Sequence, residues 1–325
     1  MDEQKVKVEF HSPLAELMTR FLYEKQTCGY RYERDSYELL RLDHFLCLIG
    51  LKTAGLPRDV VDKWTARKIN ETPSNQKLRV IRIRQLALFL RQEGVEAYVP
   101  EAPRIPVNRT EFVPYIFCRK EIEKLLDAVD RMPPDPRAPM RHWIMPEIFR
   151  LLYCCGMRVG EVLQLQVADV DLDSGVLTIR EGKFNKDRLV PMALSIAMRM
   201  RRYASVLDNS SIVFFPAPNG GPYSKVTVYQ IFRRLLLACH IPHGGRGRGP
   251  RLHDLRHSYA VHKLESWYRE GADLGAKLPI LSTYMGHKSL VGTQRYLRLT
   301  PEIFPDITNR LGQFTGHVIP RRAER

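Results

Sequence analysis

The stretch GVLTIREGKFNKDRLVPM, residues 175–192, alternates apolar and polar side chains in two runs that are separated by a polar turn. Alternation with a period of two is typical of a half-buried β-strand. We therefore predict two strands, GVLTIREG and DRLVPM, joined as a hairpin through KFNK. SIVFF, residues 211–215, predicts a further short strand, and helical spacing dominates elsewhere. The pattern indicates a mainly α protein with a small antiparallel β-sheet.

Residues 10–98 also have a helical pattern. Apolar side chains recur three and four residues apart in two groups: Leu14, Leu17, Met18, Phe21 and Leu22, then Leu39, Leu42, Phe45 and Leu46. The next stretch, YVPEAPRIPVNRTEFVP, holds four prolines, which prevent a continuous helix and favour an extended linker. A chain of 325 residues fits two domains better than one. We expect an N-terminal helical domain over residues 1–105 and a C-terminal domain over residues 106–325.

The chain carries a net charge of +15, from 51 Lys and Arg against 36 Asp and Glu. A basic balance of this size favours an anionic partner, either nucleic acid or a membrane surface. The sequence has no run of about 18 apolar residues, and its first residues lack the apolar core of a signal peptide. Nucleic acid is therefore the expected partner. The six cysteines form no CxxC pair, so we expect reduced, mostly buried thiols in a cytoplasmic protein.

Several candidate catalytic side chains lie where they can reach an anion. Arg158 lies in GMRVGEVLQL at a predicted helix start, where free backbone N–H groups already favour negative charge. Lys183 lies at the tip of the predicted hairpin, and Lys186 belongs to the same hairpin. His253 and Arg256, in RLHDLRHSYA, are one helical turn apart, so both can point in the same direction.

The stretch GHKSLVGTQRY, residues 286–296, adds His287 directly after a glycine and Tyr296, with eight residues between the two. With the preceding candidates, this order resembles the tyrosine recombinases, the phage-integrase family. That family has an arginine in a G-x-R-x-x-E helix start, a lysine in a β-hairpin, then H-x-x-R, G-H and a tyrosine about nine residues later. The resemblance covers nearly the whole chain and implies that Glu161 braces the site. The six catalytic residues that it implies are Arg158, Lys183, His253, Arg256, His287 and the nucleophile Tyr296.

These residue types suit phosphoryl transfer, which concentrates negative charge on the non-bridging oxygens of the phosphate. A guanidinium donates bidentately and stays protonated, so Arg158 and Arg256 are expected to clamp the scissile phosphate. The Tyr296 hydroxyl needs help to lose its proton near neutral pH. His253 is expected either to take that proton or to hydrogen-bond the phosphate. The family implies that Lys183 donates a proton to the departing 5′ oxygen.

Other histidines belong to the same part of the chain. His287 is expected to donate a hydrogen bond to the phosphate and so to support the transition state. His257 and His262 follow His253 on the same predicted helix and are interpreted as core or surface residues without a catalytic role. No acidic cluster at metal-ligand spacing accompanies these positions, so we expect no metal and no other cofactor.

Five further arginines are predicted to contact DNA. Arg79 and Arg82 lie in a basic amphipathic stretch over residues 71–94, where a solvated face explains a single arginine as well as a phosphate contact does. The glycine-rich stretch HGGRGRGPR, directly before the helix of His253, holds Arg246, Arg248 and Arg251. Three arginines among glycines favour phosphate contact over a simple linker.

The resemblance also implies an assembly. It implies two domains that enclose DNA, the first of core-binding type, and a homotetramer acting on two recombination sites during integration, excision or transposition. A helix that starts at Thr300, with an apolar face of Ile303, Phe304, Ile307 and Leu311, is predicted to pack on a neighbouring protomer. The long spacer before MGH favours a mobile-element recombinase. Two alternatives stay open: a type IB topoisomerase and a non-catalytic DNA-binding regulator.

Overall fold

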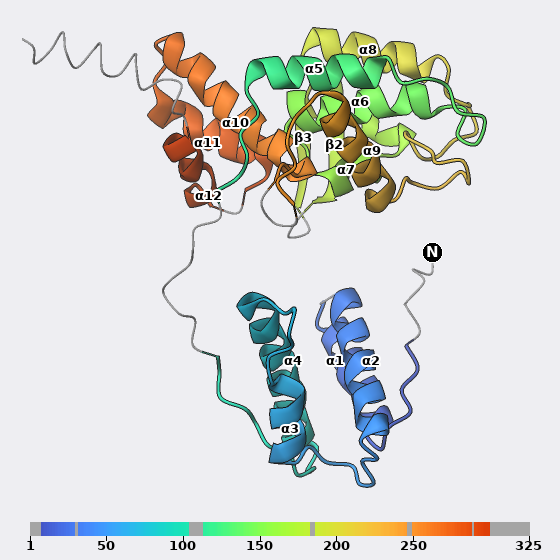
Figure 1. The fold of residues 1–325 in the computed structure, drawn as a ribbon, viewed down its shortest axis with the longest axis vertical. Helices are drawn as coiled ribbons and strands as arrows, with labels where there is room; N and C mark the ends of the chain where they lie inside the picture. The colour runs from blue at the N-terminus through green and yellow to red at the C-terminus, as the bar shows by residue number, and fades with distance from the viewer. Residues whose placement is uncertain are drawn as a thin grey trace, which may run out of the picture. The chain divides into compact units, whose positions relative to one another are not determined.

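A computed structural model of the chain describes residues 8–29, 32–103, 113–182, 186–245, 249–287 and 289–299 (Figure 1). The chain divides into two compact units, residues 1–110 and 111–325. The predicted boundary after residue 105 falls in the segment 104–112, outside the described residues. Within the described part, no helix is both long and apolar enough to cross a membrane.

The first unit is a set of helices around one apolar core. Helix α4 begins after Thr72, whose side-chain oxygen accepts a hydrogen bond from the backbone N–H of Asn75, and Pro73 is its first residue. Both features are favoured at a helix start. The helix ends close to Gly94, whose φ of +77° suits glycine. The described helices are α1 (Ala15–Thr27), α2 (Glu33–Leu48), α3 (Arg58–Thr65) and α4 (Pro73–Gln92).

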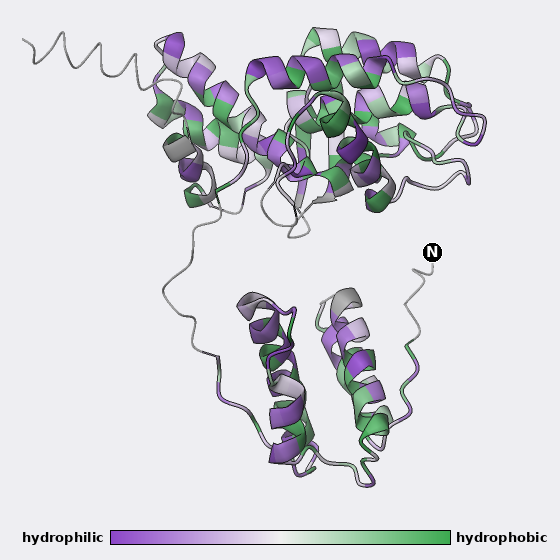
Figure 2. Ribbon diagram, in the orientation of Figure 1, coloured by the Kyte–Doolittle hydropathy of each residue, from purple (hydrophilic) through white to green (hydrophobic). Residues whose placement is uncertain are grey.

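Hydrophobic and hydrophilic residues alternate along the helices of both units, as Figure 2 shows. In α1, for example, Met18, Phe21 and Leu22 are buried, and these positions share one face of a helix. Leu39 and Leu42 of α2 are buried in the same core. The helical spacing that predicted these elements is therefore the spacing of the residues that pack, and the prediction of a mainly helical fold is confirmed.

The second unit combines helices with an antiparallel sheet in the order β1-β2-β3. In the pairing of β2 with β3, Leu177 lies opposite Val190, and both side chains are buried. The hairpin predicted over residues 175–192 is confirmed. The described elements are α5 (Arg119–Asp130), α6 (Arg141–Cys154), α7 (Val159–Leu163), η1 (Val167–Asp169), β1 (Val170–Asp171), β2 (Val176–Gly182), β3 (Lys186–Pro191), α8 (Leu194–Ala204), α9 (Lys225–Ala238), α10 (Leu252–Arg269), α11 (Leu274–Met285), α12 (Val291–Gln294) and η2 (Arg295–Leu299).

The strand predicted at residues 211–215 is wrong. Val213 makes only an isolated bridge to Gln166. Phe214 and Phe215 are both buried although they are adjacent. Neighbouring residues of a strand face opposite sides of a sheet, so the burial of both fits a packed bend better than a strand with one buried face.

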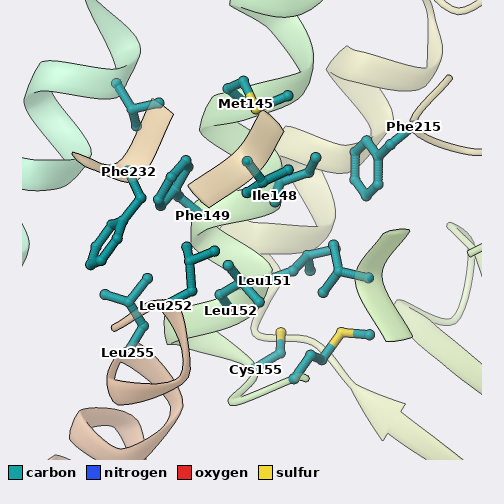
Figure 3. Close-up of a cluster of buried hydrophobic side chains, with 14 of the residues drawn as sticks. Met145, Ile148, Phe149, Leu151, Leu152, Cys155, Phe215, Phe232, Leu252 and Leu255 are labelled. Carbon is teal, nitrogen blue, oxygen red and sulfur yellow. The ribbon is translucent and has the colours of Figure 1, made fainter. Parts of the chain in front are cut away.

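Helix α6 lies in the core of the second unit. Every residue from Ile144 to Leu152 is buried, as expected for a helix surrounded by other elements. Figure 3 shows Phe149 and Leu152 of α6 among the apolar side chains that include Leu252 and Leu255 from the start of α10. This packing fixes the start of α10, which carries His253 and Arg256.

Gly156→Ala is expected to destabilise the second unit by about 3 kcal/mol, because backbone strain and overpacking each add about 1–2 kcal/mol. Gly156 has a φ of +57°, and a Cβ there would lie 2.4 Å from Cδ1 of Tyr259. The matched control is Gly220→Ala, since Gly220 has a φ of +79° but no atom within 4 Å of the added Cβ. Urea unfolding measures both variants, and equal losses would contradict the steric argument.

Candidate active site

Arg158 is the N-cap residue of helix α7. Its backbone N–H donates to Oε2 of Glu161 at 2.9 Å, and its Nη1 donates to Oε1 at 2.5 Å. Its Nη2 donates to the carbonyl oxygen of Gly286 at 2.8 Å, which joins the start of α7 to the end of α11. The sequence-predicted helix start is present, and Glu161 and Gly286 together fix the guanidinium.

Glu161 also accepts hydrogen bonds from Arg188 of β3, a residue for which no role was predicted. Nη1 of Arg188 lies 2.9 Å from Oε1 and Nη2 lies 2.8 Å from Oε2, while Nε donates to the carbonyl oxygen of Tyr284 at 3.0 Å. Burial would raise the pKa of Glu161, but the hydrogen bonds and charge of Arg188, with those of Arg158, hold this pKa at about 2. Glu161 is therefore an ionised carboxylate that ties β3 to α7.

Arg256 lies on α10 and is 1% exposed. Its Nη1 donates to the carbonyl oxygen of Gly156 and its Nη2 to that of Met285. Burial, with the nearby charge of Arg158, lowers the pKa of Arg256 to about 10, so the side chain still carries its charge at neutral pH. Arg256 thus holds the backbone that leads to Arg158 and the backbone that leads to His287.

His287 follows Gly286, whose φ of +64° places it in the left-handed region where glycine is favoured. Nδ1 of His287 lies 2.8 Å from Oγ1 of Thr293, which fixes the ring against helix α12. The ring centroids of His287 and Tyr296 are 6.1 Å apart. Burial and the charges of Arg256 and Arg158 lower the pKa of His287 to about 4, so its imidazole is neutral at pH 7.

Tyr296 lies on η2 and is 4% exposed. Its hydroxyl lies 2.9 Å from Nδ1 of His257, and the two ring centroids are 5.5 Å apart. Burial raises the pKa of Tyr296, although the charges of Arg256 and Arg295 oppose this shift. The tyrosine that the sequence singled out is a buried, protonated hydroxyl in contact with a histidine.

His253 packs edge-on against His257, with ring centroids 4.7 Å apart. More than a third of His253 is exposed to solvent, yet the protein around its ring, with His257 and Arg256, lowers its pKa to about 4. His257 was not predicted as a site residue. Its spacing of four from His253 was the available signal, since residues i and i+4 of a helix share a face.

The described residues thus bring together most of the predicted site. Arg158, Glu161, Arg256 and His287 are joined by hydrogen bonds to one another or to adjacent backbone, and Tyr296 contacts the rings beside them. Three predicted residues lie outside the described part of the chain: Lys183, Arg246 and Arg248.

Arg79 does not fit its predicted contact with DNA. It is 3% exposed, and its guanidinium pairs with Glu71 at 2.5 Å and donates to the carbonyl oxygen of Ala66 at 2.9 Å. These contacts stabilise the turn between α3 and α4, so the guanidinium of Arg79 is not available to bind a phosphate. A basic residue on an amphipathic helix looks the same in sequence whether it faces solvent or pairs inside.

Arg82 and Arg251 keep part of their side chains accessible. Arg82 of α4 pairs with Asp35 of α2, and 21% of its side chain is exposed. Arg251 pairs with Asp254 at 2.8 Å at the start of α10, and 41% of its side chain is exposed. Both positions are compatible with a phosphate contact, which stays a prediction.

The stability of the protein is expected to fall as the pH is lowered from about 6.5 to about 4. His257 and His287 have pKa values of about 4 in the folded protein, against about 6.5 in an unfolded chain. Between these values the unfolded state binds more protons, so acid favours unfolding, by up to about 1.4 kcal/mol per pH unit for each group. Urea unfolding across this range tests the prediction. The double variant His257→Asn, His287→Asn should show a shallower slope, and an unchanged slope would contradict it.

Within the described residues, no group of three or more His, Cys, Asp or Glu side chains is arranged to hold a metal ion. The charged groups of the site are instead the guanidiniums of Arg158, Arg188 and Arg256 around the carboxylate of Glu161. Fixed guanidiniums beside a buried hydroxyl can hold an anionic group for attack by that hydroxyl.

Known proteins match this chain over most of its length. The phage integrase family matches residues 117–302. The putative integrase/recombinase y4rB of Sinorhizobium fredii is 33% identical over 76% of this chain and 81% of its own length. The tyrosine recombinase XerA of Thermococcus kodakarensis is 31% identical over 70% of this chain and 73% of its own.

The fold agrees with these sequence matches. The solved structure of the Tn1549 transposon integrase in complex with transposon right end DNA has a TM-score of 0.58 and 14% sequence identity. It covers 85% of this chain and 92% of that chain, so the two share a fold. The two-unit, mainly helical fold with its small antiparallel sheet agrees with these matches, and so does the order of the motifs in the sequence. The chain therefore belongs to the phage integrase family of tyrosine recombinases.

Proposed function

We propose that this protein is a site-specific DNA recombinase that cleaves and rejoins DNA strands through a 3′-phosphotyrosyl intermediate, with Tyr296 as the nucleophile. The proposal is supported in this chain by the contacts of Arg158 and Arg256. Arg256 and Arg158 donate to the consecutive carbonyl oxygens of Met285 and Gly286, directly before His287, whose ring lies beside Tyr296. Two fixed cations and a histidine next to a buried tyrosine hydroxyl suit attack on a phosphodiester.

In cleavage, Oη of Tyr296 forms a bond to the phosphorus while the bond from phosphorus to the 5′ oxygen breaks. Arg158 and Arg256 stabilise the charge on the non-bridging oxygens, and His287 donates a hydrogen bond to the same phosphate. The 5′ oxygen leaves with a proton, which we assign to Lys183. Rejoining reverses these steps, so the phosphotyrosyl link conserves the bond energy and no nucleotide cofactor is consumed.

We further propose that the protein acts as a homotetramer on double-stranded DNA sites in the cytoplasm, for integration, excision or transposition of a mobile element. The net charge of +15 supports DNA as the partner, and a transposon integrase solved with DNA shares the fold. In this proposal residues 1–105 form the core-binding domain and residues 106–325 the catalytic domain. The helix predicted to start at Thr300 and to contact a neighbouring protomer lies outside the described residues.

The proposal is tested on a supercoiled plasmid carrying two copies of a duplex that the protein selects from a random library. Recombination between the two copies by the wild type, and none by Tyr296→Phe, is the expected result. Relaxation of a plasmid without these sites, and no recombination, would favour the type IB topoisomerase alternative. Binding of the selected duplex without any strand cleavage would favour the non-catalytic regulator.

A further inference from the structure

The side chain of Tyr296 belongs to an apolar cluster, and its hydroxyl makes a polar contact. The cluster also includes Leu264, Leu281 and Met285. The hydrogen bond at 2.9 Å joins the hydroxyl to Nδ1 of His257 on α10. A buried hydroxyl needs such a partner, because an unpaired polar group in an apolar site costs free energy.

The two histidines on this face of α10 differ in what they contact. His253 is exposed and packs edge-on against His257 at 4.7 Å. His257 is half-buried and lies between His253 and Tyr296. In the described residues the Tyr296 hydroxyl shares its hydrogen bond with His257 and not with His253. His253 is therefore the more exposed of the two rings, and His257 is the one that contacts the nucleophile.

Burial and a cationic surrounding keep the imidazole of His257 neutral. Arg256 on its own helix and Arg251, the residue before that helix, lie close to it. Arg295 of η2 and His287 after α11 face it from the elements packed against α10. Burial and these charges lower the pKa of His257 to about 4. A neutral imidazole has one ring nitrogen free to accept a proton, and the geometry puts Nδ1 against the tyrosine hydroxyl.

We propose that His257 is a catalytic residue that aligns the Tyr296 hydroxyl and takes its proton through Nδ1 as the hydroxyl attacks DNA. This inference rests on the proposed function of Tyr296. As the bond between Oη and phosphorus forms and the bond to the 5′ oxygen breaks, the hydroxyl proton moves to Nδ1 of His257. The 5′ oxygen receives a separate proton from the general acid. In rejoining, His257 returns its proton to the departing Tyr296 oxygen.

The test is single-turnover cleavage of a nicked suicide duplex, measured from pH 6 to pH 9 with the full-length protein. His257→Asn places an amide oxygen close to the position of Nδ1, so it can align the hydroxyl but cannot take its proton. We expect cleavage by this variant to be about 100-fold slower at pH 7. Its rate should then rise about tenfold per pH unit, because the tyrosine must lose its proton to solvent, whereas the wild-type rate stays nearly flat.

The matched control is His262→Asn on the same helix. Nδ1 of His262 lies 2.8 Å from the hydroxyl of Tyr153, so it is a second buried histidine–tyrosine pair away from the catalytic tyrosine. Its substitution should leave the pH profile unchanged. A His257→Asn rate within threefold of wild type, or a slower rate with the wild-type pH profile, would overturn the inference. Tyr296→Phe is measured in parallel, and an adduct in that variant would instead overturn the proposed function.

Discussion

Arg256→Lys is expected to lower the single-turnover rate of strand cleavage by about a thousandfold. Loss of one positioned donor at a developing negative charge costs about 100-fold to 1,000-fold, and lysine replaces a two-pronged fork with a single ammonium. The fork of Arg256 also holds the carbonyl oxygens of Gly156 and Met285. One ammonium cannot donate to both carbonyl oxygens and also bind a phosphate. The substitution therefore removes the phosphate contact and the contacts that position the side chain.

The charge is unchanged in Arg256→Lys, so binding of duplex DNA should weaken by less than tenfold, because the phosphate contacts of the rest of the surface remain. Cleavage is measured on a nicked suicide duplex and binding by fluorescence anisotropy at fixed salt. Arg233→Lys on α9, which is exposed, is the matched control and should cleave at the wild-type rate. Cleavage by Arg256→Lys within tenfold of wild type would refute the clamp.

Glu161→Gln is expected to lower the free energy of unfolding by about 3 kcal/mol, because removing one partner of a buried ion pair leaves the other charges uncompensated. Here those charges are Arg158 and Arg188, whose guanidiniums both bind the carboxylate of Glu161. We also expect cleavage to slow by about 100-fold, since Arg158 loses the group that orients it. The two effects come from the same four hydrogen bonds to Glu161.

The stability of Glu161→Gln is measured by urea unfolding, with hydrogen exchange of peptides from the second unit as the probe. Glu123→Gln on α5 is the matched control, since Glu123 is exposed and the charge change is identical. It should shift the free energy of unfolding by less than about 0.5 kcal/mol. If Glu161→Gln behaved like this control, the carboxylate would not organise the site.

Local patterns in the sequence predicted most of the fold. Alternation over residues 175–192 predicted the hairpin, in which Leu177 and Val190 are buried opposite each other. Helical spacing predicted α1 and α2. Pro73, the first residue of α4, and Gly94 after it mark the ends of that helix. These signals work because each depends on residues that are close in the chain. SIVFF at 211–215 failed because its apolar run is used in a packed bend, which has no local signature.

The candidate site was predictable from the order of its motifs, but its connections were not. The pairing of Arg188 with Glu161 joins residues 27 positions apart, and Arg158 reaches Gly286 across 128 positions. Nothing in the sequence distinguishes such an arginine from one that faces solvent. The same reason explains Arg79, which pairs inside the first unit. His257 was missed because its spacing from His253 indicates only a shared helix face. Its contact with Tyr296, 39 positions away, depends on the fold.

The central claim is that the hydroxyl of Tyr296 becomes covalently bonded to DNA. Protein trapped on a nicked suicide duplex is digested with protease and nuclease. The digest contains a peptide that carries a nucleotide attached through its 3′-phosphate, and mass spectrometry locates the modified residue. We expect this nucleotide on Tyr296 and no trapped product with Tyr296→Phe. A nucleotide on any other residue, such as Tyr284, or an adduct that persists in Tyr296→Phe, would contradict it.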